Sequence, residues 1–161
     1  MRRKSVTLIG LIVLPLIALS LGLGAACISR RPVEVGIVEG SLRPCPSSTN
    51  CVCSESGSGK ASIAPLTFVG DPAPAFASLV DLLEAESSVE ILESTDGYVH
   101  AVYYTPLLKF ADDVEFRLDP EAHVIHVRSE SRIGRSDLGT NRARIEDLRS
   151  RWIPAAEARG Q

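Results

Sequence analysis

The Asp96-Gly97 dipeptide is the feature that most restricts what this chain can fold into. Asp-Gly between two runs rich in β-branched and aromatic residues is the strongest short-range signal of a β-hairpin, and such runs stand on both sides of it. Asp119-Pro120 opens a second turn further along the chain. Turns this short connect antiparallel neighbours, so the sequence predicts a four-stranded antiparallel meander. Its strands are predicted at Val89–Ser94, Tyr98–Thr105, Val114–Leu118 and Val124–Ser129.

One helix is predicted before the meander and one after it. Asp71 followed by Pro72 is typical of a helix start, and the first helix is expected over about Ala73–Ala85. The second helix is expected to begin near Thr140 or Asn141, either of which can cap it. Apolar residues recur at helical spacing as Phe76, Leu79 and Leu83 in the first helix and as Ile145, Leu148 and Trp152 in the second. The expected fold class is therefore α+β, in the order α-β-β-β-β-α.

Alternation along the strands separates two faces of the predicted sheet. In the third strand an apolar set alternates with Glu115 and Arg117, and in the fourth an apolar set alternates with His126 and Arg128. Successive strand residues point to opposite faces, so helices are expected to cover the apolar face. The face that carries His126 and Arg128 is expected to be polar and solvated.

The front of the chain predicts export and attachment to a membrane. Arg2, Arg3 and Lys4 precede an apolar run from Val6 to Ile28. A basic start followed by an apolar middle and small residues is typical of an export signal, and about 20 apolar residues are also long enough to span a bilayer. Because the basic end tends to stay inside the cell, the rest of the chain is expected to be extracytoplasmic, in a bacterial cell envelope.

Cys27 is the candidate for lipidation. The segment LGLGAAC places small residues directly before it and resembles a bacterial lipoprotein cleavage box, although Gly24 stands where Leu is usual. An uncleaved membrane helix and an ordinary cleaved signal are the alternatives. The expected organisation is a signal or anchor segment at 1–28, a linker at 29–43, one domain at 44–155 and a tail at 156–161.

Charge argues against a nucleic-acid partner. The first 27 residues contain three basic and no acidic side chains, so the remainder carries a net charge of −6, against −3 for the whole chain. A nucleic-acid-binding domain is usually strongly basic. A local cluster of cations on this acidic protein therefore indicates a specific site or an internal network.

Such a cluster lies between Arg128 and Arg149, where RSESRIGRSDLGTNRARIEDLR contains six arginines and four carboxylates in 22 residues. The planar guanidinium group suits bidentate pairing with a carboxylate or phosphate. One interpretation is a site for an anionic small molecule or lipid head group. The residues expected to form it are Arg128, Ser131, Arg132, Asn141 and Arg142. The other interpretation is an internal network, in which Asp112, Asp113 and Asp137 pair with the same arginines and stabilise the fold.

A hydrolase-like enzyme is a further alternative, with Asp112, Asp113, His100 or His126 acting beside the arginines. Adjacent strand residues point to opposite faces, so the two aspartates are not expected to share one ligand. The sequence contains no nucleophile elbow, phosphate-binding loop or metalloprotease helix. We therefore favour a non-enzymatic binding or accessory module, without cofactor or metal, over an enzyme or a purely structural protein.

Three motifs together resemble the family called domain of unknown function 1499. They are CPSSTNCVCS (Cys45 to Ser54), FADDVEFRLD (Phe110 to Asp119) and VRSESRIGRSDLGTNRARIEDLR (Val127 to Arg149). The resemblance runs from about Pro44 to Trp152. Members of the family are typically bacterial envelope or photosynthetic-lineage proteins with no established activity, so the resemblance implies a domain without implying a mechanism.

The resemblance also implies a disulfide between Cys45 and Cys51. Outside the cytoplasm paired cysteines are usually oxidised. Cys53 stands where the family has serine, so it is expected to be a free thiol or to form a disulfide with another molecule. A redox pair, a zinc site with His100 and His126, or fully reduced cysteines are the alternatives to a structural disulfide.

Overall fold

The computed structural model describes residues 13, 33–56, 58–106 and 109–152. Apart from residue 13, the predicted anchor with Cys27 lies outside the described residues, and so does the predicted tail at 156–161. Among the described residues, no helix is long and apolar enough to cross a membrane. The elements are β1 (Ile37–Val38), β2 (Ser41–Leu42), β3 (Cys51–Cys53), the 3-10 helix η1 (Gly59–Ala61), β4 (Leu66–Thr67), α2 (Pro72–Glu84), β5 (Val89–Ser94), β6 (Tyr98–Tyr104), β7 (Ala111–Asp119), β8 (Val124–Ser131) and α3 (Thr140–Arg151).

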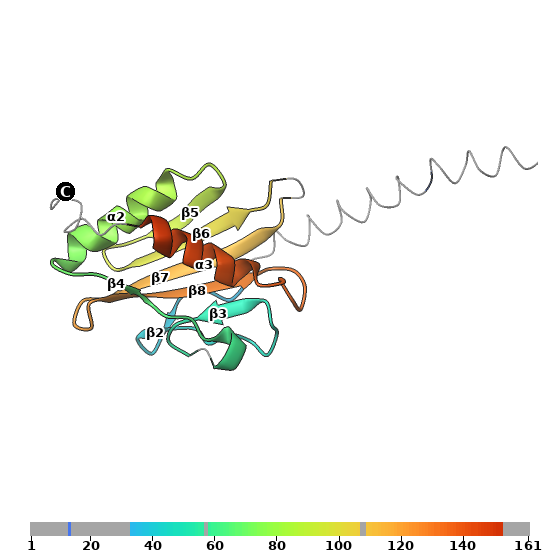
Figure 1. Ribbon diagram of the computed structural model, residues 1–161, viewed down its shortest axis with the longest axis horizontal. Helices are drawn as coiled ribbons and strands as arrows, with labels where there is room; N and C mark the ends of the chain where they lie inside the picture. Colours follow the sequence, from blue (N-terminus) through green and yellow to red (C-terminus); the bar gives the residue numbers. More distant parts are fainter. Residues whose placement is uncertain (1–12, 14–32, 57, 107–108, 153–161) are drawn as a thin grey trace, which may run out of the picture.

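The main sheet has six strands, so the predicted four-stranded meander between two helices is wrong. β5, β6, β7 and β8 are antiparallel neighbours in that order, but β3 continues the sheet beyond β8, and β4 pairs with β8 as well. β1 and β2 form a separate two-stranded sheet. The α+β class is confirmed, and Figure 1 shows the two helices together on one side of the sheet.

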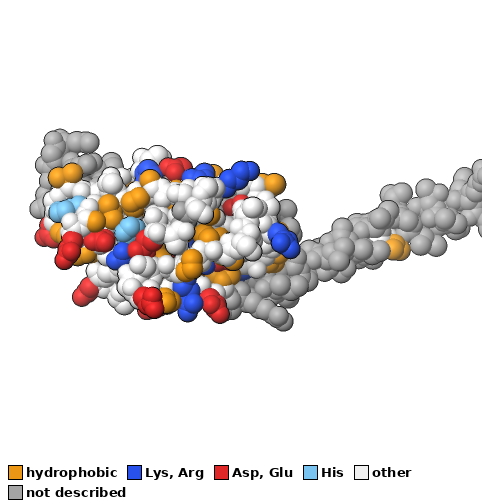
Figure 2. Space-filling view, turned by 90° about the horizontal axis from the view of Figure 1, so that it is seen from below, with side chains coloured by type: hydrophobic (Ala, Val, Ile, Leu, Met, Phe, Trp, Pro, Cys, Tyr) orange, Lys and Arg blue, Asp and Glu red, His pale blue; other side chains and the backbone are white. Residues whose placement is uncertain are grey.

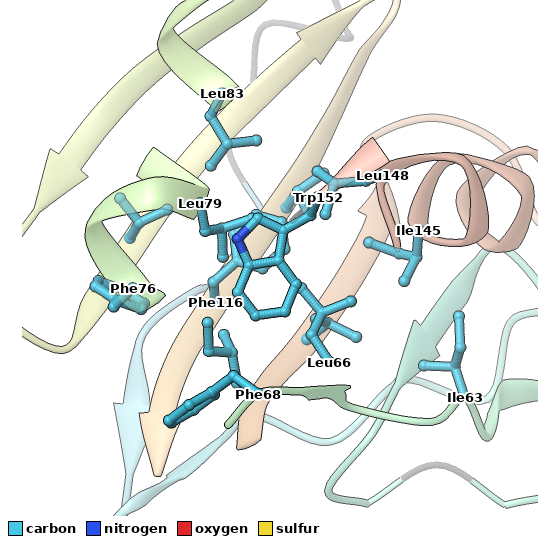
Figure 3. Packing of buried hydrophobic residues seen from close by; sticks show 14 of the residues in the cluster. Ile63, Leu66, Phe68, Phe76, Leu79, Leu83, Phe116, Ile145, Leu148 and Trp152 are labelled. Atoms are coloured by element: carbon cyan, nitrogen blue, oxygen red, sulfur yellow. The ribbon is translucent and has the colours of Figure 1, made fainter. Parts of the chain in front are cut away.

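The helices cover the apolar face of the sheet, as expected. Asp71 caps α2 by accepting a hydrogen bond from the backbone N–H of Ala73 at 3.1 Å. The indole Nε1 of Trp152 donates to Ser78 Oγ at 3.0 Å and so connects the end of α3 to α2. Figure 3 shows the core between helices and sheet, whose fully buried members include Leu66, Leu79, Leu83, Phe116, Ile145 and Leu148.

The other face of the sheet is also covered, contrary to the expectation of a solvated polar face. A segment before β3, residues 33–46, crosses it and is called here the covering segment. Leu42 in this segment is buried against Tyr98 and Cys53, and the backbone N–H of Gly36 donates to Glu115 Oε1 at 2.6 Å. Arg128 is consequently only 3% exposed. The sheet therefore has two buried faces, and one of them is polar.

Candidate functional site

Arg128 lies on this polar face, at the centre of an ionic network. Its guanidinium donates to Glu115 Oε2 at 2.8 Å and also pairs with Glu130. Tyr98 donates its hydroxyl to the same Glu115 at 2.8 Å. Burial raises the pKa of Glu130, against the lowering effect of the Arg128 charge. The two carboxylates that pair with Arg128 belong to Glu115 on β7 and Glu130 on β8. The guanidinium of Arg128 is therefore bound by groups inside the molecule.

Arg132 also pairs with a buried carboxylate on the same face. Its Nε and Nη2 donate to the two carboxylate oxygens of Asp113, each at 2.7 Å. His100 Nε2 lies 2.8 Å from Asp113 Oδ1. Burial alone would raise the pKa of Asp113, but the hydrogen bonds from Arg132 and His100 hold it below its usual range. Asp113 therefore remains charged although none of its side chain is exposed.

Asn141 joins β8, α3 and the residue before β3 on the opposite, helix-covered face. Its Nδ2 donates to Asn50 O at 2.8 Å and to Ser131 Oγ at 3.0 Å, and its Oδ1 accepts from Ser129 Oγ at 2.5 Å. Arg144 completes the cluster by donating to Asn141 Oδ1 at 2.6 Å. Asn141 is fully buried, and both its side-chain nitrogen and its side-chain oxygen have hydrogen-bond partners.

Arg144 also pairs with Asp112 and places its guanidinium 4.9 Å from the centre of the Tyr103 ring. Asp112 and Asp113 thus face opposite sides of β7, as the strand geometry predicts, and each pairs with a different arginine. Arg144 was missed by sequence reasoning, although its position three residues after Asn141 on a predicted helix places both on one face.

Two further arginines of α3 bind backbone carbonyls of one loop. Arg142 Nη2 donates to Lys60 O at 2.9 Å and to Ser62 O. Seven residues later, Arg149 donates to Pro65 O at 2.6 Å and to Ala64 O at 2.7 Å. These bonds fix the segment between η1 and β4 along the helix.

Gly139 is the N-cap residue of α3, which corrects the expectation of a cap at Thr140 or Asn141, and Asp137 supplies the side-chain acceptors at this helix start. Its Oδ1 accepts from the backbone N–H of Gly139 at 3.0 Å and its Oδ2 from that of Asn141 at 2.7 Å. Burial works to raise the pKa of Asp137, but these N–H donors hold it lowered. The first turn of the helix is therefore already supplied with an anion by the chain itself.

The predicted site residues consequently lie in three places. Arg128, Arg132 and Asp113 are on the polar face of the sheet, beneath or beside the covering segment. Ser131, Asn141 and Asp112 are on the helix-covered face, and Arg142 and Asp137 lie at the start of α3. The five expected ligand groups do not meet at one point.

A cleft of about 560 Å³ does open at the start of α3. It is lined by residues 49, 51, 52, 59, 60 and 62 together with residues 136–139 and 142, and the two cations among them are Lys60 and Arg142. Thr49, Ser62 and Ser136 contribute hydroxyl groups to its lining. Sequence reasoning missed Lys60, because nothing in its local Ser- and Gly-rich stretch indicates that it lies beside α3.

The histidines do not line this cleft. His100 is 5% exposed within the polar face. His126 Nδ1 lies 3.1 Å from Ser54 Oγ, but that oxygen also accepts the backbone N–H of Val127 at 2.9 Å. The clefts at Arg142, at Arg128 and at Asp112 are lined by other residues. The geometry therefore gives less support to the hydrolase alternative than to a binding site.

The cysteines form the disulfide that the resemblance implies. Cys45 and Cys51 are bonded, and Cys53 is free and fully buried. Among the described residues, no group of three or more His, Cys, Asp or Glu side chains is arranged to hold a metal ion.

Comparison with known proteins gives a family without an activity. No curated protein matches the sequence. Residues 41–151 match the family described as protein of unknown function, DUF1499. That range begins at the first residue of β2 and ends at the last residue of α3, and so includes both networks and the cleft. The chain therefore belongs to the DUF1499 family.

Proposed function

We propose that this protein is a non-enzymatic binding module of the bacterial cell envelope, exported and tethered to a membrane by residues 1–28. The group it binds is anionic, such as a phosphate or carboxylate. It enters the cleft beside α3, where Arg142 and Lys60 supply positive charge. The observation that carries the proposal is that two cations line one concave, hydroxyl-rich surface.

The charges of the cleft favour an anion over a cation. Asp137 is the acidic side chain in its lining, and both of its oxygens accept backbone N–H groups of α3. Arg142 is held in place by two carbonyls through Nη2, so its guanidinium is ordered before any ligand arrives. Such preorganisation lowers the entropic cost of binding. Lys60 is exposed beside it and adapts to the ligand.

Arg128 and Arg132 have a structural role in this proposal. Each already pairs with a buried carboxylate, and diverting either to a ligand would leave that carboxylate buried without its partner. Leaving such a charge unpaired costs about 3–5 kcal/mol. The internal network and the binding site therefore both exist, built from different arginines.

The tether has two candidate forms. Lipidation at Cys27 removes the residues before it and adds acyl chains, whereas an uncleaved anchor keeps the whole segment. Mass spectrometry of the full chain recovered from membranes separates the two forms, and recovery of unlipidated protein from the soluble fraction would contradict both.

Thermal unfolding of residues 30–161 tests whether an anion binds to the domain. Every buried apolar residue of the described chain lies between Leu42 and Trp152, so this fragment contains the whole core. Inorganic phosphate, glycerol phosphate and dicarboxylates are the probes. A ligand at about 100 times its Kd stabilises the folded state by about 2.7 kcal/mol, and Arg142→Gln is expected to abolish this response.

Arg149→Gln is the matched control. It removes the same kind of bond between α3 and a loop carbonyl, but its side chain lies outside the cleft. Both variants are expected to melt earlier than the wild type, while Arg149→Gln keeps the response to the probe. An equal response in Arg142→Gln, or no response of the wild type to any anion, would refute the site.

A further inference from the structure

We propose that one end of the domain rests on the anionic lipid surface of the membrane, with Leu138 inserted among the lipids. This end is formed by the described residues that end β6 and precede β7 (Thr105, Pro106, Lys109 and Phe110), by η1 and by the loop between β8 and α3. It is called here the basic end, and its exposed residues include Lys60, Lys109, Arg135 and Leu138. The inference rests on the tether of the proposed function and adds the orientation of the domain on the bilayer.

The position of Val33 restricts which end can face the membrane. Only residues 29–32 separate the apolar run, which ends at Ile28, from Val33. Fully extended, the chain from Ile28 to Val33 spans at most about 18 Å. Val33 lines a cleft together with Arg128 and Glu130. Glu130 stands next to the last residue of β8, where the chain leaves the sheet for the loop that contains Leu138. The tether therefore arrives at the basic end.

Antiparallel pairing places the turns at two opposite ends. Tyr104 pairs with Ala111, and Asp112 with Ser131, so the β6–β7 turn and the loop after β8 share one end. The β5–β6 and β7–β8 turns share the other end. Figure 1 shows this arrangement of the strand connections.

The loops at the two ends differ in charge, although the exposed Glu34 and Glu90 also lie near the basic end, where they pair with Arg43 and with the Tyr104 hydroxyl. The turns of the far end contain Asp96, Asp119 and Glu121 and no lysine or arginine. At the basic end Lys60, Lys109 and Arg135 are exposed. Figure 2 shows acidic side chains at the left end of the view and basic ones at the right end, with both kinds between them. Anionic lipids attract the basic end and repel the acidic one, although the chain as a whole is acidic.

Leu138 is a strongly exposed apolar residue among those described at the basic end. It is 97% exposed, and its φ of 54° lies in the left-handed region, which non-glycine residues rarely adopt. Asp137 bonds to the N–H of Gly139 across it, so the backbone holds the leucine outward. Folding gains nothing from a leucine in this position. Binding does gain from this leucine if the partner has an apolar layer beneath a layer of negative charge. The surface of an anionic lipid bilayer has this chemistry.

Lipid fits better than a protein partner. One exposed apolar side chain offers far less area than a stable protein interface, which buries about 800 Å² on each partner. For a domain already tethered to the bilayer, a few weak contacts suffice, because the surface is always near.

Quenching of tryptophan fluorescence by brominated lipid tests the inference. The full-length chain is reconstituted into vesicles of phosphatidylcholine and phosphatidylglycerol at about three to one, with or without dibrominated phosphatidylcholine. Trp152, the single native tryptophan, is buried at 7% exposure and gives the baseline. Leu138→Trp places a reporter at the basic end, and Glu121→Trp places a matched reporter at the exposed acidic end. Bromine quenches only nearby indoles, so we expect roughly a twofold loss of the added emission for Leu138→Trp and none for Glu121→Trp.

A second arm tests the charge. Each basic residue at an anionic surface changes the ratio of docked to undocked domain about fivefold. Adding Arg135→Gln to Leu138→Trp, or using vesicles of phosphatidylcholine alone, is expected to reduce the quenching. If the chain does not float with the vesicles, the tether and the proposed function fail. If it floats but Leu138→Trp is quenched no more than Glu121→Trp, the orientation alone is wrong.

Discussion

Asp113 shows at the scale of one residue why this sheet tolerates charge in its interior. Its side chain is fully buried, yet both oxygens accept hydrogen bonds from Arg132, and one also contacts His100. A charge-assisted, bidentate pair of this kind is among the strongest polar contacts in proteins. The pair stabilises the fold only while both partners are present, because either partner alone would be a buried, unpaired charge.

Asp113→Asn is therefore expected to lower the free energy of unfolding by about 3–5 kcal/mol, because it leaves the buried guanidinium of Arg132 without a counter-charge. Urea unfolding of residues 30–161 measures the change. Asp147→Asn is the control, since Asp147 pairs with Arg151 at the surface of α3. Removing this exposed pair is expected to cost about 0.3–0.5 kcal/mol. Similar losses in the two variants would show that burial of the Asp113 pair contributes nothing special.

At the scale of elements, the long strands and both helices could be predicted from the sequence, and the short strands could not. β5 begins and ends where its pattern and the Asp-Gly turn place it, and α2 begins directly after Asp71. β3 and β4 have three and two residues, too few for a periodicity to be recognised. They are strands only because β8 offers them hydrogen-bonding partners, which is a tertiary effect.

The site was predicted only in part, for a related reason. The motif from Arg128 to Arg149 was correctly singled out as a polar cluster, but its partners were assigned only in part: Asp113 does pair with Arg132, whereas the pairing of Arg128 with Glu115 and Glu130 was not foreseen. Glu115 and Arg128 were expected to lie on a solvated face, because residues 29–43 read as a linker. In the structure the covering segment buries that face, so arginines that alternation places in water become internal. The position of a covering segment depends on contacts far apart in sequence, such as that of Gly36 with Glu115.

The disulfide attaches the covering segment to the sheet at β3. Cys45 lies at the end of that segment and Cys51 is the first residue of β3, six positions later. Closing so short a loop restricts the unfolded chain, which stabilises the folded state by about 2–3 kcal/mol on the chain-entropy account. The double variant Cys45→Ser, Cys51→Ser is expected to lose this amount in urea unfolding of residues 30–161.

Reductant provides the matched control for this prediction. Dithiothreitol is expected to destabilise the wild type by a similar amount and to leave the double variant unchanged, because that variant has no cross-link to break. Cys53 is a free thiol in both proteins and cannot cause the difference. A wild type that is indifferent to reductant would contradict the stabilising role of the cross-link.

At the scale of the whole molecule, a sheet covered on both faces resolves an ambiguity of the sequence. β6 has apolar or aromatic residues pointing to both sides, and nearly all of them are buried. One face packs on helices and excludes charge from most of its area, whereas the other carries a network of acids, arginines and histidines under the covering segment. The stability of the whole domain therefore depends on the protonation of that second face.

His126 determines the first effect of acid on this face. Burial lowers its pKa, and Arg117 adds to the lowering, against the opposing charges of Glu55 and Asp119. The unfolded chain, with an ordinary histidine pKa of about 6.5, binds a proton that the folded chain refuses. The stability contributed by neutral His126 is thus present above about pH 6.5 and is lost as the pH falls below it.

The carboxylates act at lower pH. Hydrogen bonds from arginines keep the pKa values of Asp113 and Glu55 below their usual range in the folded state, against the effect of burial. Their contribution is complete above the ordinary carboxylate pKa of about 4 and is lost as the pH falls through the lowered values. Acid should therefore destabilise the domain in two separate steps.

Thermal unfolding of residues 30–161 between about pH 7.5 and pH 3 resolves these steps. His126→Gln is expected to flatten the fall in Tm between about pH 6.5 and pH 5 and to leave the steeper fall below about pH 4 in place, because the carboxylates are intact. His123→Gln, which removes an exposed imidazole on the turn before β8, serves as the control. If the wild type and His126→Gln lose Tm equally over the upper range, His126 is not the group that refuses the proton, and the polar face responds to acid through its carboxylates alone.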